Sequence, residues 1–135
     1  MPEGLIPHRG PARLVQTILD AAGTDVLVCG GWIPAESAFA VGGRAPAVIA
    51  LELAAQAAAV QQALAGKAGA AVAPGYLVAV RAAIVRVDDV AANVPLVATV
   101  RRTGQAGPLA TYDVTVTGPG GREILTATLS THAGD

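Results

Sequence analysis

The stretch PAVIALELAAQAAAVQQALAG, residues 46–66, is almost entirely alanine and aliphatic, yet it contains Glu52 and Gln56 four positions apart. The proline at its start and the glycine at its end stand where helices accept these residues, so the stretch predicts one long helix. On a helical wheel, its largest apolar side chains fall within roughly 60° of one another and predict the face that packs on a sheet. These side chains are Ile49, Leu53, Val60 and Leu64.

Glu52 and Gln56 lie at the flank of this apolar face on the wheel, whereas Gln61 and Gln62 are expected to point away from it. Two interpretations of Glu52 follow. It is either a boundary residue whose stem packs while its carboxylate reaches water, or a carboxylate at the rim of an apolar cavity that serves as a general acid or base. The periodicity of the helix does not choose between them.

Strand-like runs flank the helix, two before it and four after it. The first two are separated by Gly23, Thr24 and Asp25, which predicts a hairpin. In the later runs, such as TYDVTVT at 111–117, apolar and polar residues alternate, so one face of the sheet is apolar. A helix and a sheet with one apolar face each bury these faces on one another, which predicts a two-layer α+β domain. The runs are 13–21, 25–33, 76–87, 94–103, 109–117 and 122–131.

Length and charge narrow the classes of function. The chain of 135 residues predicts a single domain, residues 1–135. With 9 basic and 10 acidic residues it has no charge pattern for nucleic acid or an anionic membrane. Neither a signal peptide nor a bilayer-spanning stretch is apparent, and the single cysteine, Cys29, favours a reducing compartment, so we expect a cytoplasmic protein. No cluster has metal-ligand spacing, and we expect no metal and no cofactor.

Two segments carry a resemblance to a known family: LIPHRGPARLV, residues 5–15, and PAVIALELAAQAAA, residues 46–59. With the order of two strands, a long helix and four strands, they resemble the hotdog-fold β-hydroxyacyl-acyl-carrier-protein dehydratases. The chain is most similar to the 3-hydroxyacyl-ACP dehydratase-like proteins of aryl polyene biosynthesis. The resemblance covers most of the chain. It implies a hotdog fold, in which a sheet wraps a central helix. It also implies a thioester substrate on an acyl carrier protein and a homodimer joined at an edge strand.

The resemblance also implies roles for individual residues. In these dehydratases a glutamate of the central helix works with a histidine across the dimer interface, and a backbone N–H at the helix start polarises the thioester carbonyl. Glu52 takes the place of the catalytic acid. Arg9 and Arg44 either contact the carrier protein or the phosphate of its pantetheine arm, or have no role beyond structure and solvation. The substrate-binding residues that it implies are Gly42, Gly43, Pro46, Ala47 and Gln56.

The loop before the helix departs from the family pattern. It reads FAVGGRAPAV, residues 39–48, and has no histidine, whereas the fatty-acid enzymes carry one there in Gly-His-Phe-Pro. The chain has two histidines, His8 and His132. His132 is most simply a solvated residue near the C-terminus. His8 is either the catalytic partner of Glu52 or a structural histidine bonded to backbone.

The sequence thus predicts an enzyme that dehydrates a 3-hydroxyacyl thioester to the 2-enoyl thioester. Two alternatives stay open. One is a hotdog acyl thioesterase in which Glu52 activates water. The other is a non-catalytic hotdog subunit, which binds an acyl carrier protein or pairs with an active relative, and the missing loop histidine motivates it.

Overall fold

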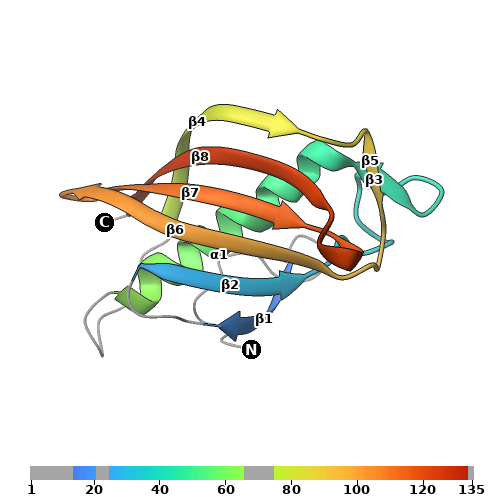
Figure 1. Cartoon of the computed structure of the whole chain (residues 1–135), viewed down its shortest axis with the longest axis horizontal. Coiled ribbons are helices and arrows are strands. Elements are labelled where there is room, and N and C mark those ends of the chain that lie inside the picture. Colours follow the sequence, from blue (N-terminus) through green and yellow to red (C-terminus); the bar gives the residue numbers. More distant parts are fainter. Residues whose placement is uncertain (1–13, 21–24, 66–74, 134–135) are drawn as a thin grey trace.

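A computed structural model describes residues 14–20, 25–65 and 75–133 of the chain. Figure 1 shows one long helix lying along one face of a large sheet, with a small second sheet near the start of the helix. Three short elements, β3, β5 and the 3₁₀ turn η3, surround that start. The elements are β1 (Val15–Asp20), β2 (Val26–Gly31), β3 (Arg44–Pro46), η3 (Ala47–Ile49), α1 (Ala50–Ala65), β4 (Gly75–Val85), β5 (Asp89–Ala91), β6 (Leu96–Ala106), β7 (Leu109–Thr117), η4 (Pro119–Gly121) and β8 (Glu123–Ala133).

The large sheet has six strands in the order β1-β2-β6-β7-β8-β4, and all neighbouring strands are antiparallel. Helix α1 contacts every one of these strands. The predicted α+β architecture, with a central helix wrapped by an antiparallel sheet of six strands, is therefore confirmed. Strands β1 and β4 form the two edges of the sheet.

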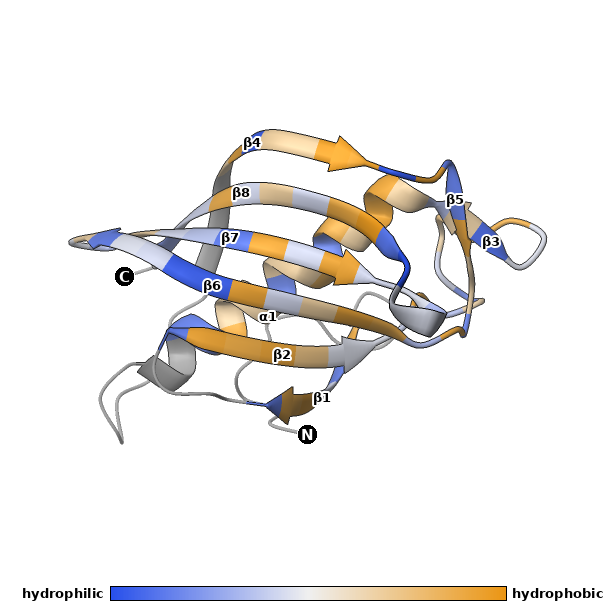
Figure 2. Cartoon of the chain, viewed as in Figure 1, coloured by the Kyte–Doolittle hydropathy of each residue, from blue (hydrophilic) through white to orange (hydrophobic). Residues whose placement is uncertain are grey.

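The alternation predicted for the later strands is also present. In β7 the side chains of Ala110, Tyr112, Val114 and Val116 are buried and alternate with more exposed ones. Figure 2 shows the same alternation of apolar and polar residues along β7 and β8. Because one face of the sheet is apolar and the other polar, the helix can cover only the apolar face.

Strands β3 and β5 were not predicted from the sequence. They pair antiparallel in a two-stranded sheet, in which Arg44, Ala45 and Pro46 face Ala91, Val90 and Asp89. Each strand has three residues, too few for a period of two to stand out from the surrounding loop. Pro46 is consequently the last residue of a strand and precedes η3, instead of standing in the first turn of the helix.

The helix is covered over a wider arc than the wheel predicted. Leu53 and Val60 are fully buried, as expected, but Gln61 is buried as well at 3% exposure. The prediction that Gln61 points away from the packed face is therefore wrong. The curved sheet reaches around a helix whose small alanine side chains, including Ala54, Ala57 and Ala58, allow a close approach on several sides.

Only one stripe of the described part of α1 is half-buried and not fully covered. It consists of Leu51, Glu52, Ala55, Ala59 and Gln62, which we call the open stripe. These positions fall within roughly 100° of one another on a helix, and Glu52 lies at one edge of that arc. Glu52 is thus the acidic residue of an otherwise largely apolar surface.

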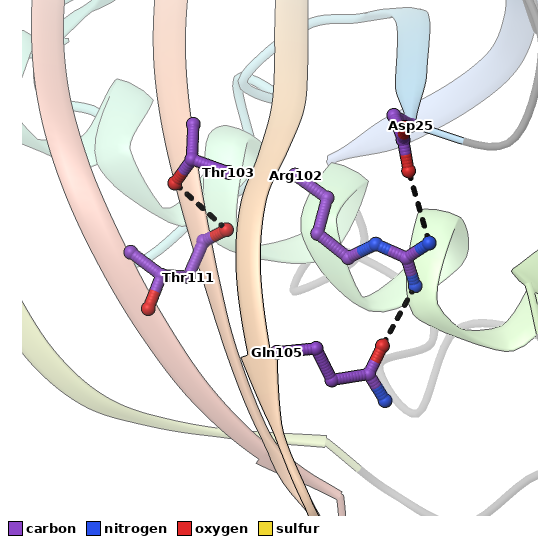
Figure 3. A network of polar contacts seen from close by, with 5 residues as sticks. All are labelled: Asp25, Arg102, Thr103, Gln105 and Thr111. Atoms are coloured by element: carbon purple, nitrogen blue, oxygen red, sulfur yellow. Dashed lines mark hydrogen bonds and ion pairs between the residues drawn. The ribbon is translucent and has the colours of Figure 1, made fainter.

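The single cysteine, Cys29, is fully buried in β2. Burial raises the pKa of its thiol to about 12, so it does not supply a thiolate nucleophile at neutral pH. The guanidinium of Arg102 on β6 donates to Asp25 at 3.0 Å and to Gln105 at 2.9 Å (Figure 3). The backbone N–H of Arg102 also donates to the carbonyl of Asp25 at 2.7 Å. These bonds tie the start of β2 to β6.

Candidate active site

The start of the helix is anchored by the small sheet. Pro46, in an extended conformation, leads into η3, and the N–H of Ala47 donates to the carbonyl oxygen of Asp88 at 3.0 Å. The first N–H of this turn is therefore engaged within the protein. The next two N–H groups are those of Val48 and Ile49. They stand in the first turn, where the N–H groups of a helix have no partner within the helix. Substrate contact by Pro46 and Ala47 stays a prediction.

Gly42 and Gly43 form a tight turn before β3. The N–H of Val41 donates to the carbonyl of Arg44 at 2.7 Å, and the N–H of Arg44 donates back at 3.1 Å. Both glycines have positive φ values, 60° and 77°, which a two-residue hairpin turn of the primed type requires. This geometry accounts for the glycine pair without a ligand, and contact with substrate stays a prediction for both.

Arg44 is held by an acidic partner that the sequence analysis did not identify. Its Nε lies 2.6 Å from Oδ1 of Asp89, which stands diagonally opposite on β5, since the register partner of Arg44 is Ala91. Both side chains are about half exposed, at 54% and 49%. The ion pair is open to solvent, and contact of Arg44 with a carrier protein stays a prediction.

Gln56 connects Glu52 to the start of β1. It is 2% exposed, and its Oε1 accepts hydrogen bonds from the N–H groups of Leu14 at 2.7 Å and Val15 at 3.1 Å. Because two donors face the oxygen, the amide NH₂ must point the other way, and Nε2 lies 3.5 Å from Oε1 of Glu52. Gln56 thus donates to the Glu52 carboxylate from one turn further along the helix. Its predicted contact with substrate is not tested by this geometry.

Glu52 lies in the first turn of α1 and is half-buried on the open stripe. The expectation that Glu52 and Gln56 flank the packed face is met: one is half-buried and the other buried.

His8 and Arg9 lie outside the described residues. His132 is half-buried on β8, and its neighbour Thr131 donates to Gln62 at 3.3 Å. Gln62 is ten residues after Glu52 in the helix, which is roughly 15 Å along the axis. His132 therefore lies toward the other end of α1.

Within residues 14–20, 25–65 and 75–133, no group of three or more His, Cys, Asp or Glu side chains is arranged to hold a metal ion. No helix in that part of the chain has the length and apolar character needed to cross a bilayer.

Solved structures of the same fold include both dehydratases and thioesterases. The dehydratase heterocomplex ApeI:P from Xenorhabdus doucetiae matches with a TM-score of 0.82 at 20% identity, over 98% of this chain and 90% of that one. A hypothetical thioesterase with coenzyme A from Streptococcus pneumoniae TIGR4 matches with 0.63 at 15% identity, over 86% and 83%. The E. coli PaaI protein from the phenylacetic acid degradation operon matches with 0.63 at 15%, over 86% and 77%. At these identities the likeness shows the hotdog fold.

The comparison with curated proteins gives no match. The comparison with models of protein families matches the ApeP-like family, described as ApeP dehydratase, over residues 1–135. That match spans the helix with Glu52 and Gln56 as well as all six strands of the large sheet. The chain belongs to the ApeP-like family of dehydratases.

Proposed function

We propose that this dehydratase acts on a 3-hydroxyacyl thioester carried by an acyl carrier protein, and that Glu52 delivers a proton to the departing hydroxyl group. The observation that carries the proposal is the Glu52 carboxyl group, half-buried at the start of α1 and held by Gln56. A group held in one position contributes more to catalysis than a freely rotating one, because its orientation is fixed before the reaction.

The elimination requires two proton transfers. A base takes the proton from C2, the electron pair moves toward the thioester carbonyl, and the C3–O bond breaks as Glu52 protonates the oxygen that leaves as water. The double bond then forms between C2 and C3. The N–H groups of Val48 and Ile49, at the positive end of the helix, are suited to stabilise the negative charge on the carbonyl oxygen.

The base of this reaction remains a prediction. His8 is the residue that the family resemblance favours, and a histidine can exchange protons near neutral pH. In the family, the acid and the base come from two subunits. We therefore propose that the site is completed by a second hotdog subunit, either a copy of this chain, as predicted from the sequence, or a different one, as in the ApeI:P heterocomplex.

Strand β4 is the surface that we propose for this pairing. It is an edge strand, and Val80, Ile84 and Val85 on it are exposed at 38%, 48% and 42%. Unpaired backbone groups and exposed apolar side chains on an edge strand favour pairing with another strand. The open stripe of α1 offers a second largely apolar surface to a partner.

Ile84→Lys is expected to raise the dissociation constant of the homodimer by about 100-fold, because the ammonium group would be buried without a partner. Sedimentation velocity at micromolar concentration measures the change. Leu19→Lys is the matched control, since Leu19 is a similarly exposed residue, at 54%, on the opposite edge strand β1. A wild-type protein that is monomeric at this concentration would contradict the homodimer, and equal effects of both substitutions would contradict pairing of two copies through β4.

Mass spectrometry of a 3-hydroxyacyl carrier protein tests the reaction itself. The expected product is the same carrier protein with its acyl group lighter by one water, because the thioester stays intact. Release of the free carrier thiol would identify a thioesterase, and an unchanged substrate would favour the non-catalytic subunit. The assay is run on the chain alone and with candidate hotdog partners, because the base can come from a partner.

The aryl polyene pathway, which the family resemblance implies, and the cytoplasmic location, which the sequence favours, stay predictions. The thioesterase alternative is compatible with the fold, because solved thioesterases have the same fold as this chain. The family match favours dehydration.

A further inference from the structure

The hydroxyl group of Tyr112 is a polar atom inside the apolar core. Tyr112 lies on β7 with 0% of its surface exposed, and its hydroxyl makes no hydrogen bond with the residues that the structure describes. Buried polar groups of native proteins are bonded almost without exception, either to the protein or to an ordered water molecule, because an unbonded group loses its hydration without compensation. The Tyr112 hydroxyl therefore points to a bound partner inside the fold.

The register of the sheet places two polar side chains beside Tyr112. Its direct neighbours are Arg102 on β6 and Leu129 on β8, so Thr131, two residues after Leu129, is its diagonal neighbour on the same face. Diagonal neighbours are roughly 7–8 Å apart at Cα, a distance that a tyrosine side chain can span. Burial raises the pKa of Tyr112, whereas Arg102 and Thr131 lower it, which agrees with their position near the phenol.

Neither neighbour completes the hydrogen bonding of Tyr112. The guanidinium of Arg102 is bonded to two other side chains (Figure 3). Thr131 is 3% exposed, and its hydroxyl donates its single proton to Oε1 of Gln62 at 3.3 Å. The oxygen of Thr131 can still accept a hydrogen bond. Tyr112 and Thr131 are thus neighbours without a direct bond, an arrangement that a bridging water molecule satisfies.

The helix offers a third polar group on this side of the sheet. Gln61 is 3% exposed on the packed face of α1 and directly precedes Gln62, the residue that bonds to Thr131. Helix α1 packs against both β7 and β8. A glutamine amide can donate as well as accept hydrogen bonds. Polar groups from three elements are therefore gathered at this end of the core.

We propose that an ordered water molecule is bound among Tyr112, Thr131 and Gln61. The water accepts a hydrogen bond from the Tyr112 hydroxyl, and it donates to the hydroxyl oxygen of Thr131 and to the side-chain carbonyl oxygen of Gln61. Buried waters make about three hydrogen bonds each, which is the number that these groups supply. The same water satisfies a tyrosine hydroxyl that apolar packing alone would leave unbonded.

The bound water extends a chain of hydrogen bonds from the core to the open stripe. Thr131 passes the chain to Oε1 of Gln62, so the NH₂ group of Gln62 points away from Thr131. Gln62 belongs to the open stripe, and the chain fixes how its amide is turned there. The site lies toward the end of α1 remote from Glu52, and it takes no part in the proposed proton transfers.

A high-resolution crystal structure of the wild-type protein tests the site directly. We expect electron density for one water molecule about 2.8 Å from the hydroxyl oxygens of both Tyr112 and Thr131. Direct contact between the two hydroxyl oxygens would overturn the proposal, because no bridge would then be needed. An absence of density beside Tyr112, or density for a larger molecule, would overturn it as well.

Tyr112→Phe tests the same site in solution. The variant is expected to lower the melting temperature by about 4 °C, because the water loses a partner and the two remaining groups are less well satisfied. Without a bound water, phenylalanine would only remove an unbonded buried hydroxyl, and the melting temperature would stay the same or rise. Either of these last two results in thermal unfolding would overturn the proposal.

A double variant shows whether Tyr112 and Thr131 act through one water molecule. Thr131→Val is also expected to lower the melting temperature, and combined with Tyr112→Phe it is expected to lower it by clearly less than the sum of the two effects. Thr115→Val is the matched control, since Thr115 is a half-buried threonine on the opposite face of β7. Its effect is expected to add to that of Tyr112→Phe. Additive effects of Tyr112→Phe and Thr131→Val would overturn the shared water.

Discussion

Glu52→Gln is expected to lower kcat for loss of water from a 3-hydroxyacyl thioester by about 10²–10⁴-fold, the range for removal of a general acid. Glutamine has nearly the same shape as glutamate, and its side-chain carbonyl can still accept the hydrogen bond from Gln56. The variant therefore loses the transferable proton while it keeps the packing of the open stripe. The initial rate is measured by mass spectrometry of the acylated carrier protein.

The matched control is Glu36→Gln, which makes the same chemical change at an exposed glutamate outside α1. This variant is expected to retain wild-type turnover. Thermal unfolding of both variants establishes that each is folded as the wild type is. A Glu52→Gln variant that turns over at the wild-type rate would remove Glu52 from the mechanism, because the glutamine has no carboxyl proton to transfer.

Gly31→Ala is expected to destabilise the protein by about 3 kcal/mol or more, and to lower its melting temperature by roughly 10 °C. A Cβ atom at this position would lie 2.0 Å from the carbonyl oxygen of Leu14 and 3.0 Å from the side chain of Leu53. The carbonyl is backbone, so it can yield only if the start of β1 moves away from β2. Such a shift would also disturb the N–H groups of Leu14 and Val15, which hold Gln56 below Glu52.

The adjacent glycine provides the control for this prediction. A Cβ atom at Gly30 would lie 3.1 Å from a methyl group of Thr17 and 3.3 Å from the exposed side chain of Leu19. Side chains can rotate away, so Gly30→Ala is expected to cost less than about 1 kcal/mol. Thermal and urea unfolding compare the two variants. Equal stability of both would show that the close approach of β2 to Leu14 is not required.

Much of the fold could be predicted from local patterns. The strand-like runs flanking the helix, its position in the chain and the alternation along 109–117 all follow from periodicities of two and 3.6 residues, which each segment carries by itself. The wheel also placed Glu52 and Gln56 beside the packed face, because their angle to Leu53 and Val60 depends on helix geometry alone.

Tertiary contacts changed the interpretation of several residues. Gln61 is buried although the wheel pointed it outward, because the extent of the covered arc depends on how far the sheet curves around the helix. The pairing of β3 with β5, and of Arg44 with Asp89, joins segments 45 residues apart that are too short to show a period. Gln56, predicted as a substrate contact, bonds to backbone across 41 and 42 residues.

The sequence by itself determined the class of fold, the central helix and Glu52 as the candidate acid, since these depend on the order and spacing of neighbouring residues. Only the tertiary structure decided what holds Glu52 in place, which stripe of α1 stays open and which acidic residue pairs with Arg44. These features depend on distances between segments remote in the chain, and a local period carries no information about such distances.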